Sequence, residues 1–149
     1  QSLEGQVNQL QLQLAEMEKR KSRSYIKTPD EVTDNLHVGD RLEGSILYNT
    51  YCASCHQRDG KGDNNRFPPL VDSEWVTGDE ERLINIVLNG YQGEIEVKGK
   101  SYNGIMPNNS HLDDHAIASI ITYVRARFGK IRKSVSDYQV GNVRKATSK

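Results

Sequence analysis

The sequence predicts a mainly α-helical protein, and three observations support this. Apolar residues recur at helical spacing in four stretches, and helix-capping residues flank three of them. Segments rich in Gly, Asn and Pro separate these stretches, and the alternation typical of strands is confined to one short region. Both cysteines of the chain occur in a single motif, Cys52-Ala53-Ser54-Cys55-His56. Such a motif, set between helices and irregular loops, points to a small helical domain built around a bound group.

Length and composition limit the possibilities. The chain has 149 residues, of which 35% are hydrophobic and 27% are charged, so it fits one modest domain with extensions. No apolar run approaches the roughly 18 to 20 residues of a membrane span, and the first residues lack a signal-peptide pattern. Because the chain begins at Gln1 rather than Met, a membrane anchor upstream of residue 1 remains a hypothesis.

The first element is expected to be a helix over residues 1–22, followed by a linker over residues 23–39. Its apolar residues alternate steps of four and three: Leu3, Val7, Leu10, Leu14 and Met17. This is the spacing of a coiled-coil seam, but it covers little more than two heptads. Two interpretations stay open, namely an oligomer or juxtamembrane helix formed through residues 3–17, and a single helix that packs on its own domain.

A domain is predicted over residues 40–129, and its helices are read from their caps. Asp40 with Glu43 is expected to open a helix that leads to the cysteine motif, and Thr77 with Glu80 is expected to open a second helix that ends at Gly90. Ser110 or Asp113 is expected to cap the last helix, which Gly129 would end. The residues expected to face the core from these last two helices are Leu83, Ile84, Val87, Leu88, Ile117, Ile120, Ile121, Val124 and Phe128.

Two other segments complete the expected domain plan. The alternation of Ile95 and Val97, followed by Lys98-Gly99, predicts a small β-hairpin near residues 94–103. Residues 130–149 are expected to form a weakly structured tail. The tail is basic, because residues 125–149 carry 1 acid and 8 bases, whereas residues 40–124 carry 13 acids and 7 bases. The tail could contact an acidic partner, lipid head groups or its own acidic domain. Nucleic acid is not expected, because Tyr138 is the only aromatic residue of the tail and no binding motif is present.

The Cys-x-x-Cys-His motif predicts one covalently attached haem c. Two thiols at this spacing can add to the two vinyl groups of a haem, and the adjacent histidine can bind the iron from one side. A zinc site would need further ligands, and the nearest pair, His111 and His115, is separated from Cys55 by a gap of 55 residues. A thiol redox motif should open a helix in a strand-and-helix alternation that this chain lacks. Haem is therefore the leading hypothesis, with zinc and dithiol chemistry as its alternatives.

The second axial position of such an iron decides between electron transfer and catalysis. The candidate ligands are Met17, Met106, His37, His111 and His115. Met106 stands in a loop between Gly104 and Pro107, outside any helical stripe, 50 residues after His56. Met17 lies on the heptad seam, and both His111 and His115 are expected at the surface near the start of the last helix. We therefore expect Met106 to be the distal ligand, and a thioether there favours ferrous iron and raises the reduction potential.

From about Gly39 to Gly129 the chain resembles class I monohaem cytochromes c. It is most similar to the cytochrome c modules associated with bacterial quinoprotein dehydrogenases of the sugar and sorbosone type. The segments that carry the resemblance are residues 51–62, 67–70, 73–76, 82–84, 104–107 and 120–125. The segment before residue 39 is not part of the cytochrome pattern.

The resemblance implies an all-α class I cytochrome c fold and assigns roles to individual residues. Cys52 and Cys55 would be the thioether anchors, with His56 and Met106 as the iron ligands. The Pro69 region would offer a backbone carbonyl to the free ring nitrogen of His56. Three further residues are similar to those that pack on the haem or hydrogen-bond its propionates: Arg66, Trp75 and Tyr102.

The function expected from this site is electron transfer rather than catalysis. The domain would shuttle electrons between a dehydrogenase, or another redox enzyme, and a respiratory acceptor, in the periplasm or cell envelope on the outer side of the bacterial inner membrane. A haem sensor or peroxidase-like protein with a displaceable sixth ligand is the alternative. A third hypothesis is an anchoring module whose N-terminal helix gathers subunits around a partner enzyme.

Overall fold

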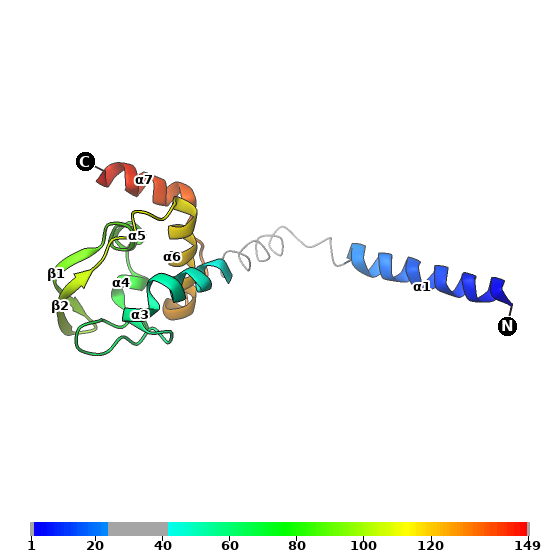
Figure 1. Cartoon of the computed structure of the whole chain (residues 1–149), viewed down its shortest axis with the longest axis horizontal. Coiled ribbons are helices and arrows are strands. Elements are labelled where there is room, and N and C mark those ends of the chain that lie inside the picture. The colour runs from blue at the N-terminus through cyan, green and yellow to red at the C-terminus, as the bar shows by residue number, and fades with distance from the viewer. Residues whose placement is uncertain (1, 24–41, 149) are drawn as a thin grey trace. The chain divides into compact units, whose positions relative to one another are not determined.

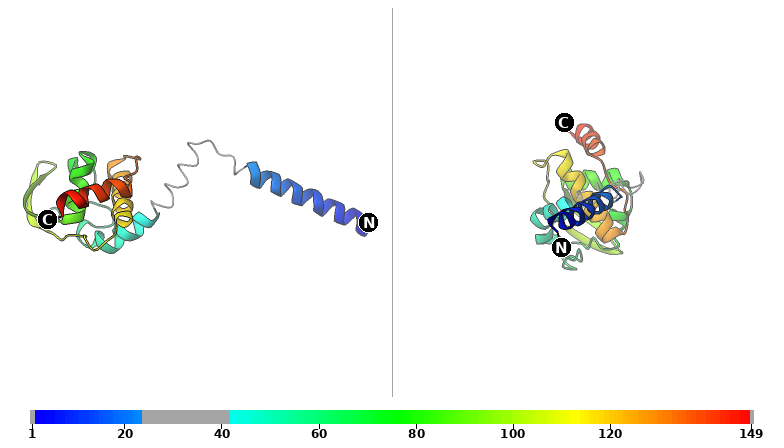
Figure 2. Two further views of the ribbon diagram at one scale, coloured as in Figure 1. Left: turned by 90° about the horizontal axis from the view of Figure 1, so that it is seen from above. Right: turned by 90° about the vertical axis from the view of Figure 1, so that its right-hand side faces the viewer.

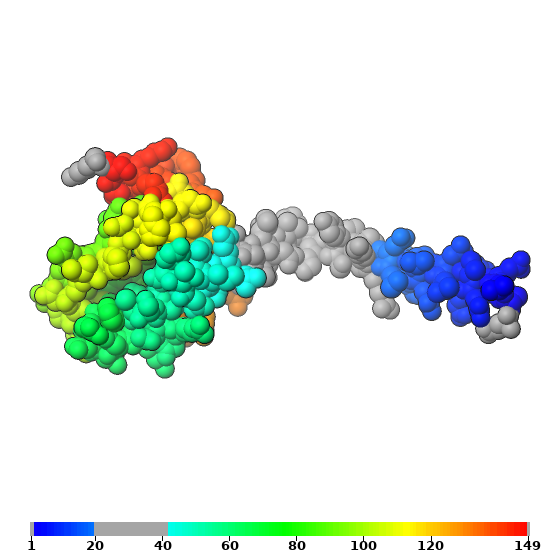
Figure 3. All heavy atoms as spheres, viewed as in Figure 1, coloured from blue at the N-terminus to red at the C-terminus, as the bar shows by residue number. Residues whose placement is uncertain are grey.

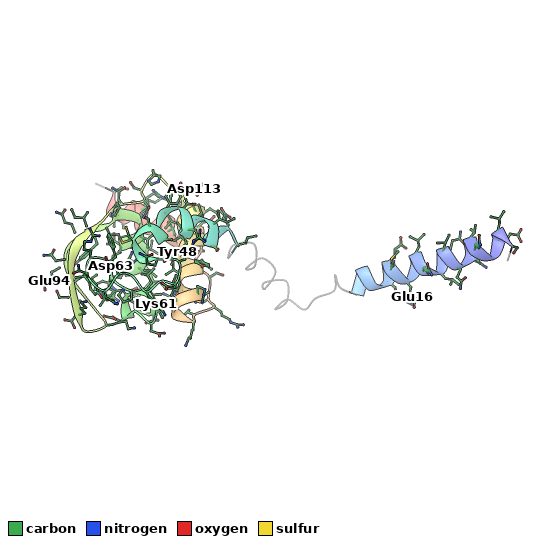
Figure 4. All side chains as sticks on the ribbon, turned by 60° about the horizontal axis from the view of Figure 1, so that its bottom comes forward. Glu16, Tyr48, Lys61, Asp63, Glu94 and Asp113 are labelled. Carbon is green, nitrogen blue, oxygen red and sulfur yellow. The ribbon has the colours of Figure 1, made fainter. Side chains whose placement is uncertain are left out.

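The computed structural model describes residues 2–23 and 42–148, which belong to two separate compact units (Figure 1). The first unit contains the helix α1 (Leu3–Arg23). The five apolar seam residues of α1 are all exposed, from 52% at Val7 to 80% at Leu3. Glu16 is among the polar side chains that accompany them (Figure 4). His37 and the expected cap Asp40 lie outside the described residues.

The second unit has the predicted mainly helical architecture with one small sheet, which confirms the fold class. Residues 42–51 are helical and lead into Cys52. The elements that follow are α3 (Ala53–His56), α4 (Glu74–Thr77), α5 (Glu80–Asn89), β1 (Tyr91–Val97), β2 (Lys100–Met106), α6 (Asp114–Gly129) and α7 (Asp137–Thr147). Among the described residues, no helix has the length and apolar content required to cross a membrane.

The helix over residues 42–51 crosses α6 at unusually close range, at Gly44. A Cβ atom built on Gly44 would lie 2.1 Å from the Ser119 carbonyl oxygen and 2.7 Å from Cβ of Tyr123. Glycine is therefore required where the two backbones meet. This crossing brings Tyr48, which is fully buried, against the rings of Tyr123 and Phe128 at centroid distances of 5.5 and 5.3 Å. Figure 4 shows Tyr48 inside the domain, whereas Glu94 lies at its edge.

The helix α5 has the predicted apolar face but a different N-cap. Its N-cap is Asp79, whose side chain accepts a hydrogen bond from the backbone N–H of Glu81. Thr77 was expected to open this helix; it is instead the last residue of α4, whose N-cap is Ser73. Asp79 lies one residue before the helix and so suits the cap position better than Thr77. The predicted end at Gly90 is confirmed, with a φ of 76°.

The helix α6 confirms the predicted cap at Asp113, which accepts a hydrogen bond from the N–H of Ala116. All five of its predicted core residues are buried: Ile117, Ile120, Ile121, Val124 and Phe128. The helix includes Gly129, and the left-handed residue that ends it is Lys130, with a φ of 56°. The predicted end was therefore one residue early.

The predicted hairpin is confirmed, although it is longer than residues 94–103. β1 and β2 pair antiparallel from Tyr91↔Met106 to Val97↔Lys100, around a turn at Lys98 and Gly99. Both turn residues have positive φ, of 52° and 77°. This is the left-handed backbone that two-residue hairpin turns of type I′ require. The register places Met106 at the end of the hairpin that joins α5, rather than in a free loop.

The prediction of a weakly structured tail over residues 130–149 is wrong. Residues Asp137–Thr147 form α7, which has a complete capping box between Ser136 and Gln139. It packs on α5 and α6 (Figures 2 and 3). Val140 and Val143 are buried in the common core. Two spaced valines in a basic segment gave too weak a periodic signal to predict this helix.

Basic residues of the tail segment form ion pairs with acidic residues of their own domain. Contact with the domain was one of the three possibilities expected for the tail. The Arg144 side chain lies 2.7 Å from the Asp114 carboxylate and also donates to the carbonyls of Ser110 and Leu112. Lys133 lies 3.3 Å from Glu80. These contacts pair part of the basic segment with acidic residues of the same fold.

Candidate cofactor cavity

A cavity with a predominantly apolar lining lies between the cysteine motif and the hairpin. Its walls come from segments far apart in the sequence, including α3, the 66–70 loop, α5, both strands and α6. All eight predicted site residues line it: Cys52, Cys55, His56, Arg66, Pro69, Trp75, Tyr102 and Met106. The folding of the chain thus gathers residues that the sequence separates by up to 54 positions.

The short helix α3 presents the motif to the cavity. Within it the N–H groups of Cys55 and His56 both donate to the carbonyl of Cys52, at 3.2 and 3.0 Å. Cys52, Cys55 and His56 all line the cavity. Both cysteines are free thiols, and burial, followed by the proximity of Cys55, raises the pKa of Cys52 to about 12.

The His56 ring is held by the 57–72 loop. Its Nδ1 lies 2.9 Å from the carbonyl oxygen of Pro68, which can only accept, so Nδ1 carries the proton. The other ring nitrogen, Nε2, therefore keeps its lone pair, and burial lowers the pKa of the ring so that it stays neutral. The acceptor is the carbonyl of Pro68 and not that of Pro69, which lines the cavity one residue further along.

Asp63 organises the loop that carries this carbonyl. One of its carboxylate oxygens accepts hydrogen bonds from the backbone N–H groups of Asn65, Arg66 and Phe67, at 2.8 to 3.0 Å. These hydrogen bonds lower the pKa of Asp63, and the bond from Phe67 has the largest effect. Gly62, with a φ of 63°, packs so closely on the Phe67 carbonyl that a Cβ atom would lie 2.2 Å from it. The loop is thus a tied structure that fixes the position of Pro68.

Met106 lines the cavity from a segment 50 residues after His56. It is half-buried at the end of β2, and its backbone faces Tyr91 across the hairpin. Met106 and His56 line the same cavity, which is the arrangement that two ligands of one metal would need.

The three residues expected to contact a haem all border the cavity, in different ways. Trp75 donates from its indole nitrogen to the Glu96 carbonyl at 2.8 Å, and the Arg82 guanidinium stacks 4.0 Å from its ring centre. Tyr102 is only 3% exposed. The side chain of Arg66 is 76% exposed and lies at the rim, 3.9 Å from Asp63.

Sequence reasoning missed two residues that support the cavity. The Tyr48 hydroxyl donates to the Gln57 carbonyl at 2.6 Å and so ties the helix before the motif to the loop after it. Tyr48 lies four residues before Cys52, and residues four apart are neighbours on one face of a helix, so this spacing could have predicted that Tyr48 lies at the site. The second residue is Asn109, which is buried. It could not be predicted, because a single buried polar residue in a loop leaves no periodic pattern in a sequence.

His111 and His115, two of the alternative ligands, do not line the cavity. His111 packs edge-on against Tyr51, and His115 bonds to Glu43 at 2.9 Å and to Asp137 at 3.2 Å. Both histidines are exposed, as expected. Within the part of the chain that the structure describes, no three His, Cys, Asp or Glu side chains are grouped as a metal site.

The residues present fit a covalently attached haem. The cavity is apolar, two unpaired thiols stand beside it, and a neutral imidazole with one free nitrogen faces the same space. Fold and site together define a c-type cytochrome domain.

Comparison with known proteins agrees with this class. The family model described as cytochrome C oxidase, cbb3-type, subunit III matches residues 39–124, and the chain belongs to this family of cytochrome c domains. Its cofactor is one covalently bound haem c, and its role is electron transfer.

Several characterised relatives are similar to the chain. It is 39% identical over 97 residues to cytochrome c-552 of Thermus thermophilus, which covers 62% of this chain and 73% of that protein. It is 33% identical over 129 residues to the fructose dehydrogenase cytochrome subunit of Gluconobacter japonicus, covering 84% of this chain and 26% of the subunit. The alcohol dehydrogenase (quinone) cytochrome c subunit of Gluconobacter oxydans is 34% identical over 94 residues, covering 61% of this chain and 19% of the subunit.

Proposed function

We propose that the domain carries single electrons on a haem whose iron is held by His56 and Met106. The observation that supports this most directly is that the two side chains line one apolar cavity although 50 residues separate them in the sequence. When bound, haem c supplies reversible one-electron chemistry at its iron. A second protein ligand would leave no open coordination position for oxygen or peroxide.

The residues of the chain have four tasks in this proposal. Cys52 and Cys55 anchor the group covalently. The bond from His56 Nδ1 to the Pro68 carbonyl orients the imidazole and directs Nε2 toward the cavity. The apolar lining excludes water, so that little reorganisation accompanies a change of charge. The neutral thioether of Met106 favours the reduced state.

The ferric absorption spectrum tests this ligation. Full-length holoprotein should show the weak far-red band of methionine-ligated ferric haem, and Met106→Ala should abolish it. The reduced native protein should bind carbon monoxide poorly, whereas the variant should bind it readily. A native protein that lacks the band, or binds carbon monoxide as readily as the variant, would support the sensor or peroxidase-like alternative instead.

We further propose that Arg66, Trp75 and Tyr102 contact the haem or its propionates. Arg66 is the most testable, because its charge stands at the rim of the cavity. Arg66→Gln should lower the reduction potential, since loss of a nearby positive charge stabilises the ferric state. Arg58→Gln is the matched control, because Arg58 is an exposed arginine that does not line the cavity. Equal potentials in the two variants would argue against the contact.

The partners proposed are a dehydrogenase as donor and a respiratory acceptor, in the periplasm or cell envelope. The support is that two relatives are named as cytochrome subunits of a fructose and a quinone alcohol dehydrogenase. Mixing the ferric protein with a substrate-loaded quinoprotein dehydrogenase should reduce it at a rate that rises with enzyme concentration. The absence of reduction by sugar- and alcohol-oxidising enzymes alike would oppose this assignment.

A further inference from the structure

Asn109 is a buried polar residue, 8% exposed, three positions after Met106. It makes three hydrogen bonds. Its backbone N–H donates to the Leu88 carbonyl at 3.0 Å, its side-chain Nδ2 donates to the Val87 carbonyl at 2.9 Å, and its own carbonyl accepts from the N–H of Leu112 at 3.0 Å. Both donor bonds from Asn109 therefore go to the last turn of α5.

The last turn of α5 needs such partners. The final carbonyls of a helix have no intrahelical donors. Here the N–H of Gly90 satisfies the Ile86 carbonyl, and Asn109 satisfies the next two. Asn109 thus caps α5 from a segment 20 residues further along the chain, and the same bonds fix the segment that follows Met106.

The residue before the hairpin constrains Met106 from the other side. Gly90, with a φ of 76°, lies against the Met106 backbone, where a Cβ atom would be 2.5 Å from the Met106 carbonyl oxygen and 2.9 Å from the N–H nitrogen of Asn108. The hairpin register places Tyr91 opposite Met106. The backbone of Met106 is therefore held against the end of α5 before and after the residue.

We infer that Asn109 is a positioning residue for Met106, which keeps the thioether aimed into the cavity. This inference rests on the proposed ligation of the iron by Met106. A thioether is a weak neutral ligand, so its occupancy depends on how well the chain pre-organises it. Loss of the buried hydrogen bond at Asn109 should therefore raise the affinity for an external ligand that competes with Met106 by about tenfold.

The test compares Asn109→Asp and Asn109→Ala with Asn108→Asp in full-length holoprotein. A carboxylate at position 109 cannot donate to the Val87 carbonyl, and alanine removes the side-chain bond alone. Asn108 is the matched control, because it is exposed and its Oδ1 only accepts, from the N–H and hydroxyl of Ser110, as a carboxylate also would. The readouts are the far-red band of the ferric form and the Kd for imidazole.

We expect both Asn109 variants to bind imidazole about tenfold more tightly and to lose part of the far-red band, with Asn108→Asp within about twofold of the native protein. Val143→Ala, in the core of α7 and away from the cavity, shows whether general destabilisation has the same effect. If Asn109→Asp fails to fold, Asn109→Ala carries the test.

Three results would overturn the inference, and they lead to two conclusions that can be told apart. If both the band and the imidazole Kd of Asn109→Ala match the native protein while Met106→Ala changes them, Asn109 does not position the ligand and the proposed ligation stands. An equal change in Val143→Ala would lead to the same conclusion. If the native protein lacks the band and Met106→Ala leaves the imidazole Kd unchanged, the ligation itself is wrong and the inference falls with it.

Discussion

Gly44→Ala should destabilise the domain more than the same substitution at its other helical glycines, Gly129 and Gly141. The new Cβ atom would lie 2.1 Å from the Ser119 carbonyl oxygen, 2.9 Å from the Ser119 carbonyl carbon and 2.7 Å from Cβ of Tyr123. Ordinary contact begins at about 3.4 Å, so the two helices would have to separate by roughly 1 Å. No rotamer change relieves this contact, because two of the three neighbours are backbone atoms of α6.

The magnitude follows from two opposing terms. Overpacking of a close-packed core costs about 1–3 kcal/mol, and a contact with rigid backbone belongs at the upper end of that range. Replacing glycine by alanine within a helix returns about 1 kcal/mol through helix propensity. The expected net loss is therefore about 2 kcal/mol, which in a unit of this size lowers the Tm by about 9 °C.

Guanidinium unfolding of the holoprotein, followed by far-UV circular dichroism, measures this loss. Gly141→Ala is the control, because Gly141 also lies within a helix of the same unit, and its added Cβ would meet only the Asp114 carboxylate, at 3.1 Å. That flexible side chain can move, so the control should unfold within about 1 kcal/mol of the native protein. If Gly44→Ala proves as stable as the native protein, the close helix crossing does not control the stability of this fold.

Three further predictions concern surface features. The hydrogen bond to Glu43 has the largest effect on His115, followed by that to Asp137, and both raise its pKa. The contribution of His115 to the stability of the fold is therefore complete below about pH 6.5 and is lost as the pH rises through the raised folded-state pKa. Because the ring is exposed, this change amounts to less than about 1 kcal/mol, and His115→Gln should remove it from unfolding curves measured between pH 5.5 and 8.5. Asp63→Ala should free the loop, so that trypsin cuts after Arg66 faster than in the native protein, and unchanged cleavage would contradict the role of Asp63. If residues 3–17 form an oligomer, removal of residues 1–22 should lower the solution mass to that of a monomer, and an unchanged mass would exclude it.

The sequence alone was enough to locate the cofactor site because the chemistry of attachment is local. Cys52, Cys55 and His56 are nearly adjacent, so their spacing carries the information without any knowledge of the fold. The buried faces of α5 and α6 were equally predictable, since helical periodicity is also a local property. Met106 could be singled out as a methionine that no helical stripe explained.

Features that depend on packing between distant segments were harder to predict. The helix α7 has only two buried valines, and its stability comes from Arg144 and from contacts with α5 and α6. The carbonyl that orients His56 belongs to Pro68, one residue from the expected position, because the turn around Asp63 sets which oxygen faces the ring.

By itself the sequence predicted haem attachment at Cys52 and Cys55 and the helices around the site, since both follow from residues close together in the chain. Only the tertiary structure decided how the segment around Met106 is held. There Gly90 and Asn109 hold Met106 against the end of α5, through contacts between backbones that no spacing along the sequence encodes. The physical reason is that covalent chemistry and helix periodicity act over a few residues, whereas the position of a weak ligand depends on the close packing of the whole domain.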